Sequence, residues 1–218
     1  GARIDLGPGT SFELLGGVGP VAQTVALGEG GTLLADVEVT LSVDATVVTV
    51  TGFGGAFRVE RDTTPRIATY DAAVGIRGDT AVSMTRLSQV PLGGPQDAVG
   101  PIILDPTDPW DRRHAESPLE TDAQLANLAT GLRATYGSAP QRPAFYRDFV
   151  GVTEGLVEAL PQLAPVDQGE RFGPPAETLI AAAAVTALVE GTGRPLQEVL
   201  ASVLVLRAAG GTWGVILA

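Results

Sequence analysis

The pattern of apolar and polar positions changes near the middle of this 218-residue chain. Before residue 105, apolar side chains alternate with polar ones in short runs separated by glycine, which is typical of β-strands. The clearest run is 33–43, where valine or leucine occupies every second position from 37 onward. After residue 118, apolar side chains recur every three or four positions, which is typical of helices. The pattern therefore predicts a β-rich half followed by a helical half.

Many short strands joined by turns are predicted in the first half. The segment 4–15 contains a Gly/Pro turn between two short runs. Further strands are predicted over 21–27, 33–43, 46–51, 57–59, 67–70, 73–77, 80–87 and 99–104. Glycine, proline and aspartate are frequent in the breaks, as they are in turns. Strands at this near-regular spacing favour an antiparallel β-sandwich or barrel.

About four helices are predicted in the second half. The sequence Ser117-Pro118-Leu119-Glu120 has the order of a capping box, with Ser117 at the N-cap, so the first helix is expected to begin there. Gly137 is expected to end it. The other helices are predicted over 144–160, where Pro161 ends the helix, over 175–189, and from Leu196 to the Gly210-Gly211 pair. The helix over 175–189 is apolar nearly all round and is expected at the centre of its unit.

The fold class predicted from these patterns is α+β. An N-terminal antiparallel β-sandwich or barrel is followed by a helical half of about four helices and a short C-terminal strand over 213–217. The expected boundaries are 1–104 for the β-rich half, 105–118 for a seam and 119–218 for the helical half. If the last strand rejoins the sheet, the two halves form one domain.

Composition removes several classes of chemistry. The chain has 25 acidic and 14 basic residues, a net charge of −11 and no cysteine, and every basic residue is arginine. Disulfides, thiolate catalysis, Schiff-base lysines and a complete P-loop are therefore excluded. An acidic chain disfavours nucleic acid and anionic membranes as partners, and no apolar run is long enough to span a bilayer. We expect a soluble protein, with the cytoplasm as the favoured compartment.

The seam carries the densest group of polar side chains, and it suggests a metal site. Asp105, Asp108 and Asp111 are spaced so that their carboxylates can turn toward one point, and hard cations prefer oxygen ligands. They are the predicted ligands of a divalent cation. The competing interpretation is structural, because Asp-Pro pairs form turns and acidic side chains satisfy the first N–H groups of a helix.

The only histidine of the chain also lies in the seam. His114 is a candidate general base, with Asp111 as the group that orients it. Arg112 and Arg113 are candidate ligand-binding residues for an anion, and Trp110 is a candidate beside them. In the alternative interpretation His114 is a solvated loop residue, and the arginines form ion pairs with the nearby acids.

Two hypotheses for the function follow. The first is a non-enzymatic assembly or protein-binding module that self-associates, whose partner is a second copy or another protein. Its support is that nucleotide-binding and Gly-x-Ser-x-Gly motifs are missing, while a run of small residues, 181–184, permits close helix packing. The second is a small-ligand or divalent-metal-dependent enzyme with its site at the seam, where sheet and helix meet.

Overall fold

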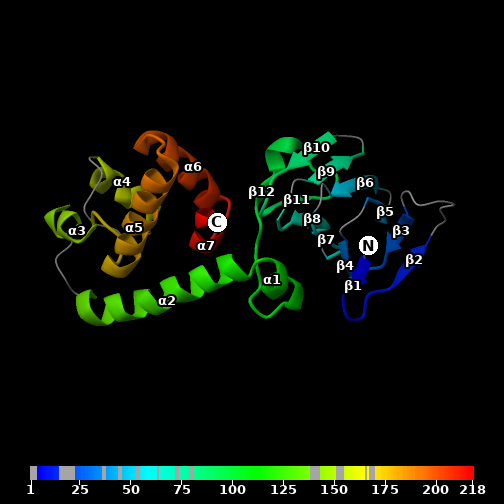
Figure 1. The fold of residues 1–218 in the computed structure, drawn as a ribbon, viewed down its shortest axis with the longest axis horizontal. Coiled ribbons are helices and arrows are strands. Elements are labelled where there is room, and N and C mark those ends of the chain that lie inside the picture. Colours follow the sequence, from blue (N-terminus) through cyan, green and yellow to red (C-terminus); the bar gives the residue numbers. More distant parts are fainter. Residues whose placement is uncertain are drawn as a thin grey trace. The chain divides into compact units, whose positions relative to one another are not determined.

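The computed structural model describes residues 4–14, 23–35, 38–43, 46–52, 55–62, 64–71, 74–78, 81–137, 143–150, 155–164, 166 and 170–218. It divides into two compact units, Gly1–Glu116 and Ser117–Ala218. We call them the β unit and the helical unit, and each is described by itself (Figure 1). The division falls within the predicted seam.

The β unit contains two six-stranded sheets. The first sheet is antiparallel and has the order β1 (Ile4–Leu6), β4 (Thr32–Ala35), β7 (Phe57–Glu60), β8 (Arg66–Thr69), β11 (Ser88–Pro91) and β12 (Gly100–Pro101). The second has the order β10 (Ala81–Met84), β9 (Val74–Arg77), β6 (Thr46–Gly52), β5 (Val39–Val43), β3 (Gln23–Leu27) and β2 (Phe12–Leu14). Its strands pair antiparallel except β3 and β5, which are parallel. A short 3₁₀ helix, η1 (Gln96–Ala98), precedes β12.

The apolar faces of the two sheets form one core. Leu33, Phe57 and Ile67 of the first sheet belong to the same buried cluster as Val39 and Val50 of the second. Alternate residues of each strand point to this core, as the period of a strand requires. The predicted antiparallel sandwich is confirmed.

The prediction of one continuous strand over 33–43 is wrong. β4 pairs with β1 and β7 in the first sheet, whereas β5 pairs with β3 and β6 in the second. Val37 lies outside the described residues. β4 has three consecutive buried apolar residues and β5 alternates, but the sequence between them contains no glycine or proline to mark where the chain passes from one sheet to the other.

The helical unit packs around the helix α5. Its elements are α2 (Glu116–Tyr136), α3 (Pro143–Val150), α4 (Leu156–Leu163), α5 (Pro175–Thr192), α6 (Leu196–Ala208) and α7 (Trp213–Leu217). The core cluster holds Leu160 of α4, Val185 of α5 and Leu200 of α6, together with Phe172 and Tyr146. Ten residues of α5 are buried, which confirms the predicted central helix. Among the described residues, no helix has the length and apolar character needed to span a membrane.

Three predictions about helix boundaries are wrong. The segment 144–160 contains α3 and α4, and Gly155 precedes α4 with a left-handed φ of 86° that favours glycine. Pro161 lies inside α4 and does not end it. α2 begins at Glu116, so Ser117 is not its N-cap residue.

The C-terminal segment 213–217 is the helix α7 and not a strand. Thr212 is its N-cap residue and accepts a hydrogen bond from the Val215 amide at 3.4 Å. Asp122 of α2 accepts another from the amide of Gly214 at 2.7 Å. Because these polar contacts satisfy the first N–H groups of a helix, they favour a helix over a strand here. A five-residue apolar run cannot distinguish the two.

Candidate functional site

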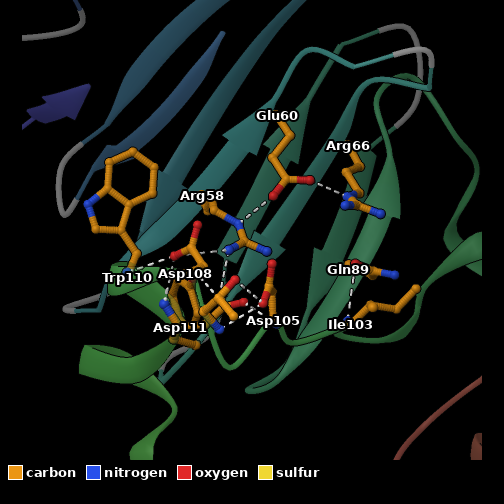
Figure 2. Close-up of polar contacts among 11 residues, drawn as sticks. Arg58, Glu60, Arg66, Gln89, Ile103, Asp105, Asp108, Trp110 and Asp111 are labelled. Atoms are coloured by element: carbon orange, nitrogen blue, oxygen red, sulfur yellow. Dashed lines mark hydrogen bonds and ion pairs between the residues drawn. The ribbon is translucent and has the colours of Figure 1, made fainter. Parts of the chain in front are cut away.

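Two seam aspartates shape the backbone that leads into a helix the sequence did not predict. α1 (Pro109–His114) begins after Asp108, whose Oδ1 accepts hydrogen bonds from the amides of Trp110 at 2.7 Å and Asp111 at 3.0 Å. Asp105 accepts hydrogen bonds from the amide and the hydroxyl of Thr107, both at 2.7 Å. These are the contacts of an N-cap and an Asx turn. Figure 2 shows them at the edge of α1.

The third aspartate is fully buried and carries three hydrogen bonds. Asp111 is 0% exposed. Its Oδ1 accepts from Arg58 Nη1 at 2.6 Å and from the Tyr70 hydroxyl at 2.7 Å. Its Oδ2 accepts from the Asp105 amide at 2.7 Å. The carboxylate therefore joins α1 to β7 through Arg58 and to the residue that follows β8, Tyr70.

Arg58 is the cation at the centre of this network. It points from β7 toward the start of α1 and is only 3% exposed (Figure 2). Its Nε forms an ion pair with Glu60 at 2.9 Å, and its Nη1 lies 3.8 Å from Asp108 Oδ1. Glu60 also pairs with Arg66 of β8. The guanidinium lies over the Tyr70 ring, 5.6 Å from its centroid, so the cation is surrounded by groups that stabilise its charge.

Burial and the neighbouring charged and hydrogen-bonding groups shift the pKa values of Arg58, Asp111 and Tyr70. Burial lowers the pKa of Arg58, but Tyr70, Asp111 and Glu60 outweigh it, so that pKa lies above its ordinary value. Burial raises the pKa of the Asp111 carboxyl, against the opposing effects of the Asp105 amide, the Tyr70 hydroxyl and the Arg58 charge. Burial likewise raises the pKa of Tyr70, which stays protonated at neutral pH and can donate to Asp111. We call Arg58, Tyr70 and Asp111 the seam clamp.

The other predicted site residues lie around the clamp. Trp110 and His114 are half-buried, and Arg112 and Arg113 are exposed. His114 lies with its ring centroid 5.3 Å from that of Tyr70. The structure therefore joins Asp105, Asp108 and Asp111 with Trp110 through hydrogen bonds, whereas the two arginines point to solvent as ordinary surface side chains.

No cation site emerges from the described residues. None of their His, Asp or Glu side chains form a group of three or more that could hold a metal ion. The divalent-cation site on Asp105, Asp108 and Asp111 stays a prediction, and the contacts above give each of these carboxylates a structural partner.

A second candidate is a surface on α6. Its inner side, with Leu196, Val199, Leu200 and Val203, is buried in the helical unit. Its outer side carries three exposed apolar side chains at positions i, i+4 and i+7, which we call the α6 stripe: Ala201, Val205 and Ala208, while Leu204 beside them packs partly against the core. Val205 is 69% exposed, more than any other exposed large apolar side chain of the described residues. The stripe contains no charged residue.

Comparisons with known proteins do not identify the chain. No family model matches it, and no curated protein matches it. Two crystal structures from Parabacteroides distasonis ATCC 8503, each described as a "putative anti-sigma factor", align with it at a TM-score of 0.33. The identities are 15% and 16%, over 44% of this chain and 49% and 48% of those chains. The chain thus matches about half the length of those proteins, and a TM-score this low carries no inference about shared fold or function.

Proposed function

We propose that this protein is a non-enzymatic, protein-binding module that self-associates through the α6 stripe. The observation that carries the proposal is that the outer side of α6 exposes Val205 between Ala201 and Ala208, although the inner side of the same helix is buried in the helical unit. An apolar side of a helix is normally buried against another surface. The uncovered side therefore favours contact with another protein surface.

The lack of charge in the α6 stripe permits contact with a second copy there. With a net charge of −11, two copies repel each other over most of their surface. The stripe lacks charge, and the nearest ionic side chains at the start of α6, Arg194 and Glu198, form an ion pair at 3.5 Å. Burying a valine side chain contributes roughly 1.5–3 kcal/mol, and a two-fold dimer buries Val205 twice.

The contacts of the seam clamp argue against the alternative hypothesis of an enzyme with its site at the seam. To act as a base or as a metal ligand, Asp111 must release Arg58 or Tyr70, and an unpaired buried charge is costly. Asp108 would have to give up the cap of α1. These contacts favour a structural role for the seam acids, so we advance no enzymatic function.

The test is the oligomeric state of three proteins across a range of concentrations, measured by sedimentation velocity. The wild-type protein is expected to form a dimer as its concentration rises. Val205→Glu places a charge at the centre of the stripe and is expected to stay monomeric, because each copy would bury a carboxylate. Gln162→Glu adds the same charge at an exposed position of α4 and is expected to dimerise like the wild type.

Far-ultraviolet circular dichroism would show that both variants keep their helices, since Val205 and Gln162 are exposed. A wild-type protein that remains monomeric at high micromolar concentration would refute self-association. A dimer that survives Val205→Glu unchanged would place the interface elsewhere and overturn the role of α6.

A further inference from the structure

His114 is the chain's only histidine, and it closes the C-terminal end of α1. Its ring lies beside the Tyr70 ring at 5.3 Å between centroids, with 31° between the planes. Its Nε2 atom is buried and has no hydrogen-bond partner within the described structure. Asp111, which holds α1 to Arg58 and Tyr70, lies one helical turn earlier. α1 is therefore attached to the first sheet at two points, a clamp and a histidine.

A neutral imidazole suits this position, and a charged one does not. Neutral histidine carries one N–H, so a buried Nε2 without a partner need only leave a lone pair unused. Protonation puts an N–H on both ring nitrogens, and the buried N–H at Nε2 would then have no acceptor. The charged ring gains hydrogen bonds by turning out to water.

Charged groups of both signs face the ring. On α1 they are Arg113 and Asp111, on β1 Asp5, and after β8 Asp71, while Arg58 of β7 lies over Tyr70. Burial and the charge of Arg113 lower the pKa of His114, and the three carboxylates act in the opposite direction. The lowering effects are the larger ones, so the docked ring binds a proton less readily than a ring in water.

We propose that His114 is a pH-sensitive latch, which when neutral holds the end of α1 against Tyr70 and when protonated swings out and frees that end. The released segment is short. Asp111 keeps the first turn of α1 in place through Arg58, so the change is confined to the last turn and to Ala115 and Glu116. By linkage, the ratio of released to docked ring rises up to tenfold for each pH unit below about 6.5, until the docked ring itself titrates.

The experiment is amide hydrogen exchange of residues 112–116 in the full chain, corrected for the intrinsic pH dependence of exchange. Between about pH 6.5 and about pH 5.5, corrected exchange of the wild-type segment is expected to accelerate up to about fivefold. His114→Phe keeps an aromatic ring beside Tyr70 but cannot titrate, and its corrected exchange is expected to stay constant. Because there is one histidine, its imidazole resonance reports the pKa directly.

Two arginine variants give a matched second test. Arg113→Gln removes a cation that lowers the pKa of the docked His114 ring, so docked and released rings differ less in proton affinity, and the acceleration of exchange on acidification is expected to be smaller than in the wild type. Arg112→Gln removes an equal charge from the neighbouring exposed position and is expected to leave the acceleration of exchange as in the wild type. Equal acceleration of exchange in wild type and His114→Phe overturns the latch, as does a His114 resonance that titrates at or above the value of free imidazole.

Discussion

Replacing Arg58 by methionine tests the seam clamp most directly. Methionine fills a similar volume but removes the cation, so the fully buried Asp111 carboxylate keeps only the hydrogen bonds from Tyr70 and the Asp105 amide. Glu60 loses one of its two ion pairs and retains Arg66. Because Asp111 cannot reach water without moving α1, the variant must either bury an uncompensated charge or undock the helix.

The expected magnitude follows from that burial. Removing one partner of a buried ion pair costs about 3–5 kcal/mol, which is a large share of the roughly 5–15 kcal/mol by which a domain is stable. Arg66→Met is the matched control, since Arg66 pairs with the same Glu60 but its side chain is 36% exposed. A partly exposed pair contributes at most about 1 kcal/mol, so the control is expected to change stability little.

The two tryptophans allow each unit to be followed separately. Trp110 lies on α1 in the β unit and Trp213 on α7 in the helical unit. Denaturant unfolding of single-tryptophan backgrounds is expected to show the loss caused by Arg58→Met only in the Trp110 transition. A loss below about 1 kcal/mol in the Trp110 transition would refute the reasoning, because it means that the clamp does not hold the β unit together. An equal loss in the Trp213 transition would instead show that the two units unfold together.

Two further variants test single contacts. Asp108→Ala removes the N-cap of α1 and is expected to lower the free energy of unfolding of the β unit by about 1 kcal/mol, measured by the Trp110 transition. Were Asp108 instead a cation ligand, added Ca²⁺ or Mg²⁺ would raise the melting temperature of the wild type but not of this variant. Gly214→Ala places a Cβ 2.0 Å from the backbone oxygen of Pro118, so α7 must shift, and the Trp213 transition is expected to move to lower denaturant while the Trp110 transition stays. An unchanged Trp213 transition would show that α7 is not held close to α2.

The hydrophobic pattern predicted whether a segment forms strands or helices, because that depends on residues close together in the sequence. The change from period two to period three or four located both halves, and the all-apolar segment 175–189 became the central α5. The hydrophobic pattern could not show which strands pair with each other. The run 33–43 contains no glycine or proline but is divided between two sheets, and partner choice is decided by residues distant in sequence.

The sequence identified the acidic residues of the candidate site but not their partners, which are distant in sequence. The acids at 105, 108 and 111 were identified, and the structural interpretation of Asp108 as a helix cap fits its contacts. The partners of Asp111 were missed, because Arg58 lies 53 residues away and Tyr70 lies 41 residues away. In its strand Arg58 alternates with core residues, a pattern typical of a solvent-facing side chain, and only the return of α1 over the sheet buries it.

The arrangement of α1 gives its two attachments different sensitivities. Asp111 and His114 are three residues apart on the same helix, so both face the sheet from one side. The clamp holds Asp111 by two side chains that stay protonated at mildly acid pH, Arg58 and Tyr70, and by the Asp105 amide, whereas the second attachment depends on a neutral His114 ring. Protonation of His114 therefore loosens the second attachment directly, while the first loosens only where acid also protonates the Asp111 carboxyl, whose pKa burial raises. α1 is held by Asp111 in one turn and by His114 in the next. Release of His114 alone can therefore change the conformation of Ala115 and Glu116 while the β-sandwich stays folded.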